Sequence, residues 1–215
     1  TADEMTIGAT IVASGQVVTL KSSTGGDAVD LGGTATDSGN TLELSDAELD
    51  RITATTLRIG ATDQGAIVIS AAISPQNITN LSLLSDAGVT QAGGGTITVT
   101  GLRIDVDDAV VLTQANVITT LAANVSTSAA AFSFTDAAGL ATGTVDGTVG
   151  VTTNTGTITL VATTGNITVG AAVNSGAGAV VITAVADNAS ITSTAAITGT
   201  GSGGVSLTAD DMTIL

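Results

Sequence analysis

The chain of 215 residues has 4 Lys and Arg residues against 19 Asp and Glu residues, which gives a formal net charge of −15 at pH 7. Such an acidic surface repels phosphate groups, so nucleic acid is not expected as a partner. No apolar run reaches the roughly 18 residues that a membrane-spanning helix needs, so membrane insertion of this segment is not expected either. His and Cys are absent, which excludes the usual catalytic triads, thiol nucleophiles and zinc sites.

The apolar residues are almost all Ala, Val, Ile and Leu, and Phe132 and Phe134 are the only aromatic residues. A compact globular core of this size normally uses several aromatic side chains to fill irregular space between layers. A narrow core built from stacked, similar coils can be filled with medium-sized aliphatic side chains alone. The composition therefore favours a thin and repetitive interior.

Short segments along the whole chain alternate apolar residues with Thr, Ser or Asp, the pattern of β-strands with one buried face. Clusters of Gly, Asn, Asp and Ser separate these segments and supply turn conformations. The predicted strands cover residues 17–22, 56–60, 66–70, 80–85, 96–106, 131–135, 157–162, 166–170, 179–185 and 204–209.

Corresponding apolar positions recur at the period of one coil of a β-solenoid, a class with repeats of about 20–30 residues. A β-sandwich would instead show strands every 8–12 residues or so. We therefore expect an all-β fold, a right-handed parallel β-helix of about nine coils, whose handedness rests on experience with the class. The spacings are 22 residues from Leu160 to Ile182, 25 from Ile182 to Leu207, 24 from Leu20 to Leu44 and 25 from Leu44 to Ile69.

One segment, LSDAELDRI at 44–52, breaks the β pattern. Ser45 and Glu48 have the spacing of a capping box, in which each side chain caps the backbone N–H of the other residue. Leu49 and Ile52 lie three positions apart and can share an inward face. The segment predicts a short helical insert near 46–51. It either covers the edge of a coil or forms a recognition feature, together with loops near 74–80, on an otherwise plain rod.

The two ends of the chain carry nearly the same phrase, TADEMTI at 1–7 and TADDMTI at 208–214. This repeat predicts a single solenoid segment over 1–215, which is one 207-residue unit of a tandem array plus the first strand of the next unit at 208–215. No capping helix is evident at either terminus, so we expect both ends of the rod to be open. Isolated units would then stack end to end into fibres through Met5, Ile7, Met212 and Ile214.

Three stretches resemble large bacterial exoproteins of the filamentous haemagglutinin type: LSDAELDRITATTLRIGATDQGAIVISAAIS (44–74), NLSLLSDAGVTQAGGGTITVTGLRIDV (80–106), and VVLTQANVITTLAANV leading to 131–153. The resemblance consists of many low-complexity phrases and contains no active-site motif. It implies a right-handed parallel β-helix, export by a two-partner or related route, and a place at the bacterial cell surface as an adhesin or extended stalk. The absence of Cys fits an extracellular bacterial protein without disulfides, and it fits a cytosolic protein equally well.

Candidate chemistry is sparse, and no catalytic, cofactor-binding or metal-binding residue is predicted. The densest acidic cluster, RIDVDD at 103–108, places Arg103, Asp105 and Asp107 on one strand face. These carboxylates could bind Ca²⁺, but no calcium-loop motif is present, and a solvated face partly neutralised by Arg103 is the other interpretation. DGTVG at 146–150 is interpreted as a turn.

Thr-x-Thr runs at 96–100 and 157–159 raise the possibility of an ice-binding face. Such a face needs a flat Thr array in register on successive coils. The favoured function is a non-catalytic structural segment of a surface filament or stalk, whose partners are adjacent copies of the same repeat. The alternatives are an adhesin segment that binds a glycan or protein receptor, and a polysaccharide-active enzyme that uses paired carboxylates.

Overall fold

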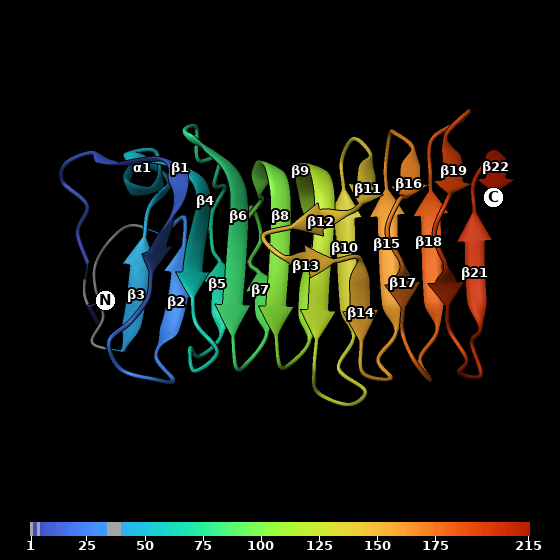
Figure 1. The fold of residues 1–215 in the computed structure, drawn as a ribbon, viewed down its shortest axis with the longest axis horizontal. Coiled ribbons are helices and arrows are strands. Elements are labelled where there is room, and N and C mark those ends of the chain that lie inside the picture. Colours follow the sequence, from blue (N-terminus) through green and yellow to red (C-terminus); the bar gives the residue numbers. More distant parts are fainter. Residues whose placement is uncertain (1, 4, 34–39) are drawn as a thin grey trace.

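The structure, a computed structural model, describes residues 2–3, 5–33 and 40–215. Within these ranges the chain forms a parallel β-solenoid of about seven turns, stacked along the long axis of Figure 1. The one helix of the described residues is α1 (Asp46–Leu49). The all-β solenoid predicted from the sequence is therefore confirmed, and its right-handed sense stays a prediction. Thr1 and Glu4 of the terminal repeat lie outside the described residues.

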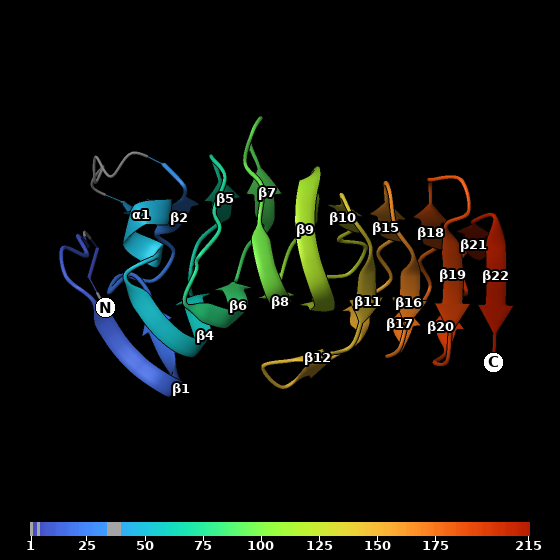
Figure 2. The ribbon, with the colours of Figure 1, turned by 90° about the horizontal axis from the view of Figure 1, so that it is seen from above.

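Two parallel sheets, here named A and B, form the walls of the solenoid, and Figure 2 shows them as two rows of strands. The long strand β9 (Val110–Val125) passes from sheet B into sheet A. Sheet A also holds β1 (Ile11–Leu20), β4 (Ile52–Gly60), β6 (Ile78–Ser85), β8 (Thr98–Val106), β11 (Leu140–Thr142), β14 (Val151–Thr153), β16 (Ile167–Val169), β17 (Val173–Asn174), β19 (Ser190–Ser193), β20 (Ile197–Thr198) and β22 (Asp211–Ile214). Sheet B also holds β2 (Ala28–Leu31), β3 (Thr41–Leu44), β5 (Ile67–Ile69), β7 (Val89–Gln91), β10 (Phe132–Asp136), β15 (Ile158–Ala162), β18 (Val180–Ala184) and β21 (Val205–Thr208).

The core consists of inward-facing aliphatic side chains that stack in register from coil to coil. Because side chains alternate along a strand, each coil of sheet B contributes the same two inward positions. Phe132 and Phe134 widen this core at β10, where both are fully buried and their ring centroids lie 6.5 Å apart. One continuous stack in sheet B comprises Val29, Ile67, Val89, Val110, Phe132, Ile158, Val180 and Val205.

Each predicted strand overlaps an observed one, but several observed strands, including the long β9, were not among those predicted. The register confirms part of the predicted period. Leu160, Ile182 and Leu207 are direct neighbours on β15, β18 and β21. The equivalence of Leu20 with Leu44 is wrong, because Leu20 pairs with Ile59 in sheet A whereas Leu44 pairs with Leu31 in sheet B. A spacing of one coil length does not say which sheet a strand joins.

The solenoid has about seven turns where the spacing predicted about nine. Two segments of the chain lengthen a coil without adding a further coil to the stack. In sheet A, Leu20 pairs with Ile59, so the 39 positions between them (59 − 20) add a single layer. The second segment is an antiparallel hairpin made of β12 (Thr144–Val145) and β13 (Thr148–Val149), which leaves the coil between β11 and β14.

A buried polar corner joins the two sheets where β9 bends. Asn116 and Asp136 are fully buried register neighbours there. Asn116 Oδ1 accepts a hydrogen bond from the Ile97 N–H at 2.9 Å, and its Nδ2 donates to the Thr135 carbonyl at 3.0 Å. Burial raises the pKa of Asp136, although three backbone N–H groups, one of them from Ile118, donate to its carboxylate and oppose the rise. These bonds satisfy the corner side chains that cannot reach water.

Candidate functional site

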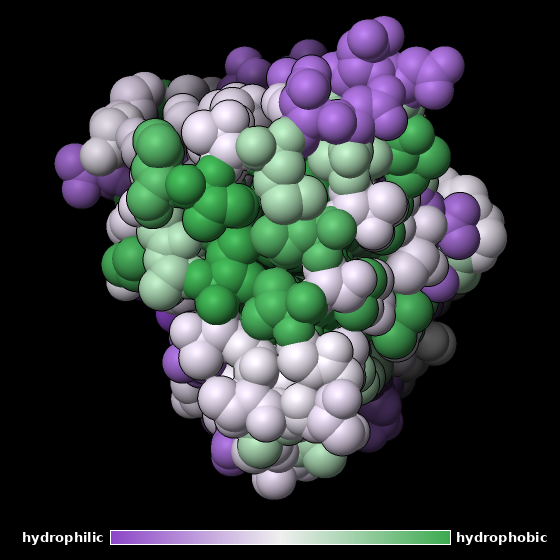
Figure 3. All heavy atoms as spheres, turned by 90° about the vertical axis from the view of Figure 1, so that its right-hand side faces the viewer, coloured by the Kyte–Doolittle hydropathy of each residue, from purple (hydrophilic) through white to green (hydrophobic). Residues whose placement is uncertain are grey.

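The carboxyl-terminal end of the described rod presents a cross-section of the apolar core. β21 and β22 are the last strands of sheets B and A, and among the described residues no further strand pairs with them. Val205, Met212 and Ile214 are 43%, 45% and 57% exposed, whereas the equivalent residues one coil earlier, such as Val180, are fully buried. Figure 3 shows the resulting hydrophobic patch, which surrounds a hollow of about 390 Å³. The hollow is lined by Ser193, Thr194, Ala195, Ala196, Ile197, Val205, Leu207, Ile214 and Leu215.

The amino-terminal end is different, because α1 and the segment that precedes β1 lie against it (Figure 2). Ile7 is only 5% exposed and Met5 packs against the core. The Ile7 N–H donates to Glu48 Oε1 at 3.0 Å, and Arg51 Nη1 donates to the Ile7 carbonyl at 2.7 Å. The expectation of an uncapped amino-terminal end, with Met5 and Ile7 free for stacking, is therefore corrected. Val12 on β1 nevertheless stays 68% exposed there.

Local capping chemistry explains why a helix forms at this end. The predicted capping box is present, and the Glu48 carboxylate accepts hydrogen bonds from the Ser45 N–H at 3.0 Å and from Ser45 Oγ at 2.7 Å. Burial alone would raise the pKa of Glu48, but these hydrogen bonds, the Ile7 N–H and the charge of Arg51 hold that pKa below its ordinary value. Leu49 and Ile52 are fully buried, as predicted from their spacing.

The terminal repeat takes two conformations in one chain. Near the carboxyl terminus, Met212 and Ile214 belong to β22 and pair with Ile191 and Ser193 of β19. Near the amino terminus, Met5 and Ile7 form no strand, and the described residues provide no earlier coil of sheet A that could pair with them. Within the described structure, this sequence is a strand only at the carboxyl-terminal end, where β19 supplies the hydrogen-bonding edge.

The hairpin β12–β13 lies across the outer face of sheet A, over β8 and β9 (Figure 1). Its tip is an Asp146–Gly147 turn with φ of 46° and 86°, the left-handed pair that a two-residue hairpin turn of type I′ requires. This confirms the turn predicted from DGTVG. Val145 is 3% exposed and packs beside Gly101, where any side chain would collide with Asn80 and crowd Val145.

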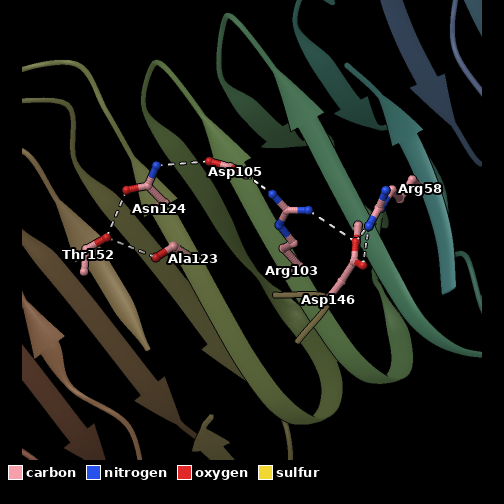
Figure 4. A network of polar contacts seen from close by, with 8 residues as sticks. Arg58, Arg103, Asp105, Ala123, Asn124, Asp146 and Thr152 are labelled. Atoms are coloured by element: carbon pink, nitrogen blue, oxygen red, sulfur yellow. Dashed lines mark hydrogen bonds and ion pairs between the residues drawn. The ribbon is translucent and has the colours of Figure 1, made fainter. Parts of the chain in front are cut away.

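Asp146 joins three successive coils of sheet A (Figure 4). Its carboxylate accepts from Arg58 Nε and Nη2, both at 2.7 Å, from Ser82 Oγ at 2.7 Å and from Arg103 Nη1 at 3.2 Å. The hydrogen bonds from Arg58 are the main reason that the pKa of Asp146 is lowered to about 2. Two of the four basic residues of the chain are thus used to fasten the hairpin.

The acidic cluster predicted at 103–108 extends this network and does not gather into a metal site. Arg103 Nη2 binds the Asp105 carboxylate, and Asp105 Oδ1 accepts from Asn124 Nδ2 at 3.0 Å (Figure 4). Asp107 follows the end of β8 and accepts from Ser126 instead. No group of three or more acidic side chains in the described part of the chain is placed to hold a metal ion. The interpretation as a face partly neutralised by Arg103 fits these contacts.

A groove of about 460 Å³ runs along the solenoid beside the hairpin face. The loop at 74–77 forms one wall and is fastened to α1, since the Ser74 N–H donates to Asp46 Oδ1 at 2.6 Å and the Gln76 N–H donates to Asp50 Oδ1 at 3.0 Å. The sequence had placed a recognition patch at this insert and these loops, and the structure brings the two together. Charged side chains do not line the groove, which consists of Ser74, Pro75, Gln76, Ile78, Thr98, Val99, Thr100, Val117, Ile118, Thr119, Ala138 and Gly139.

Comparisons of the chain with protein families, with curated proteins and with solved structures found no match. Among the described residues, no helix is long and apolar enough to cross a membrane.

Proposed function

We propose that this chain is a structural segment of an extracellular β-solenoid rod, of the kind found in filamentous haemagglutinin-type bacterial exoproteins, and that it acts by continuing end to end with further copies of its repeat. The observation that carries the proposal is the open carboxyl-terminal end. There a strand of the terminal repeat already belongs to sheet A and leaves Met212 and Ile214 exposed to a following coil.

The energetics of the end face favour continuation. Each large aliphatic side chain that moves from water into a packed coil contributes about 1.5–3 kcal/mol. Each strand added to β21 and β22 also pairs backbone N–H and C=O groups that otherwise remain an open edge. Continuation by the next unit supplies both the apolar burial and the strand pairing. The residues that follow TADxMTI in the repeat form a strand again, because IVASGQVVTL (Ile11–Leu20) forms β1.

Hydrogen exchange on a two-copy chain tests this proposal. In that chain, residues 1–207 are followed directly by residues 1–215. Backbone amides of Val205–Leu207 in the first copy and of residues 1–7 in the second copy, which take the place of residues 208–214, are expected to exchange more slowly than Val205–Ile214 in the single chain, because coils of the second copy cover them. The matched internal control is Val205–Ile214 in the last copy, which should keep the exchange of the single chain. Equal exchange in both copies would refute continuation.

A second function, an adhesin segment that binds a neutral glycan, is favoured by the groove beside the loop at 74–77. Its exposed hydroxyl groups, such as those of Thr98, Thr100 and Thr119, can hydrogen-bond a polyol, and its lack of charge suits an uncharged ligand. Glycan-array binding by the wild type that is lost in Thr98→Arg and kept in Thr168→Arg, which lies outside the groove, would support it. An array without binding would remove this candidate.

A further inference from the structure

The outer face of sheet B carries a row of small, uncharged side chains, here called a rank, in register on seven successive strands from β5 to β21. Every member of the rank is Val, Thr or Ser, and Val has nearly the same shape as Thr because a methyl group replaces the hydroxyl. The strand register places each residue directly beside the next. The rank comprises Val68, Thr90, Val111, Ser133, Thr159, Val181 and Ser206.

A second rank runs beside the first on the last four strands of sheet B, two residues further along each strand. Its members are Thr135, Val161, Thr183 and Thr208. Neighbouring strands lie about 4.8 Å apart, and alternate residues of one strand lie about 6.6 Å apart. The two ranks therefore form a two-dimensional lattice of methyl and hydroxyl groups on a regular parallel sheet, seen as the row β10, β15, β18 and β21 in Figure 2.

The hydroxyl groups of this lattice have no partner within the described protein, which is a separate observation. Some side-chain hydroxyls of the solenoid are bonded within the chain, for example Thr142 to the Ala171 carbonyl and Ser175 to the Gly178 carbonyl. In contrast, no hydrogen bond to a described residue is made by the side chains of Thr90, Ser133, Thr135, Thr159, Thr183, Ser206 and Thr208, all of which are half-buried or exposed. These groups are left to bond water.

Charge is also absent from the two ranks, although the chain carries 19 acidic residues. The outer face of sheet A holds Arg58, Arg103 and Asp105 and is crossed by the hairpin, and its uncharged Thr row at the carboxyl-terminal end is shorter, with Thr168, Thr192 and Thr213 in register. Strand propensity favours Thr and Val on both sheets, so what distinguishes sheet B is the length of its uncharged row and the second row beside it. On sheet B, Asp30 and Glu43 stand at the amino-terminal edge, before the first rank begins at Val68.

We propose that the outer face of sheet B, built on these two ranks, binds ice. An ice surface repeats its oxygen atoms in two dimensions with spacings comparable to those of the lattice. Hydroxyl groups at fixed positions can take the places of lattice oxygens, and the methyl groups between them let the adjoining water stay fully bonded to itself. A charged side chain would hold its own hydration shell and disturb this order. The face binds without any end-to-end continuation of the rod.

Ice-growth measurements on the purified chain and two variants test the proposal. The wild type is expected to facet growing ice crystals and to separate the freezing from the melting temperature. Thr159→Lys places a charge within the first rank and should abolish both effects. Thr168→Lys places the same charge on an exposed position of sheet A and should keep both. Circular dichroism confirms that each variant is folded.

Three outcomes would overturn the proposal. They are unfaceted ice with the wild type, equal loss of activity in Thr159→Lys and Thr168→Lys, and binding to a crystalline polysaccharide powder without any effect on ice.

Discussion

Arg58 and Asp146, 88 positions apart in sequence, form a two-pronged ion pair in which Nε and Nη2 each lie 2.7 Å from a carboxylate oxygen. The pair fastens the tip of the β12–β13 hairpin to β4, four strands away from the coil that carries the hairpin. Arg103 and Ser82 complete the site from β8 and β6. The hairpin is therefore a strap that holds the outer face of several coils together.

Asp146→Asn is expected to destabilise the chain by about 2 kcal/mol, because each unit of pKa shift corresponds to about 1.4 kcal/mol and Arg58 and Arg103 lose their anion. Chemical denaturation measures the change. The matched control is Asp86→Asn, which alters an exposed turn carboxylate and should change the free energy of unfolding by less than about 0.5 kcal/mol. Equal effects of the two variants would show that the strap contributes nothing.

The contribution of Asp146 to stability should also depend on pH. Its pKa is about 2 in the folded chain and about 3.9 in the unfolded chain. A lowered folded pKa stabilises the fold above the unfolded value, and this stabilisation is lost as the pH falls from about 4 to about 2. The difference in unfolding free energy between wild type and Asp146→Asn should be constant above pH 5 and shrink across that window. A difference that does not vary with pH would contradict the ion pair.

Two glycines with nearly equal φ separate backbone strain from steric contact. Gly15 has φ of 76° and open space around its Cβ position, whereas Gly150 has φ of 72° and a Cβ there would lie 2.1 Å from the Ala172 carbonyl oxygen. Gly15→Ala should cost about 1 kcal/mol for the left-handed backbone alone. Gly150→Ala should cost about 3 kcal/mol because it adds a collision with the next coil. Thermal unfolding of both variants checks this ranking. If Gly15→Ala destabilised the chain as much as Gly150→Ala, the ranking would be refuted.

Phe134→Ala should destabilise the chain by about 4 kcal/mol, since Phe134 is fully buried between Leu112 and Leu160 and its loss leaves a cavity in the narrow core. Ser133→Ala on the neighbouring outward position is the control and should be close to neutral. Denaturant titration followed by far-ultraviolet circular dichroism measures both. If Phe134→Ala were as mild as Ser133→Ala, the core at β10 would not be packed as described.

The fold was predictable from residues whose role is local. Alternation identified strands such as β15 and β18, the Ser45–Glu48 spacing identified α1, and DGTVG identified a turn at 146–150, although not the hairpin to which it belongs. Features that depend on distant partners were not predictable. Nothing in the sequence near Arg58 indicates that residue 146 will reach it, and Leu20 and Leu44 share a spacing without sharing a sheet.

The two ends of the solenoid also depend on distant partners and were not predicted correctly. Met5 and Met212 stand in nearly identical sequences, yet among the described residues only Met212 has a preceding coil to pair with. The sequence therefore predicted two equal ends where the structure has one covered and one open. The Thr and Val ranks of sheet B were only partly predictable, because their alignment depends on turns of different length between the coils.

Electron cryomicroscopy of the two-copy chain, residues 1–207 followed by 1–215, tests most directly whether the repeat continues as one rod. A continuous rod should appear as a single straight particle about twice the length of the single chain, with Met5 and Ile7 of the second copy in a strand of sheet A. Two rods joined by a flexible hinge, with α1 and Met5 of the second copy still folded over its own end, would contradict it.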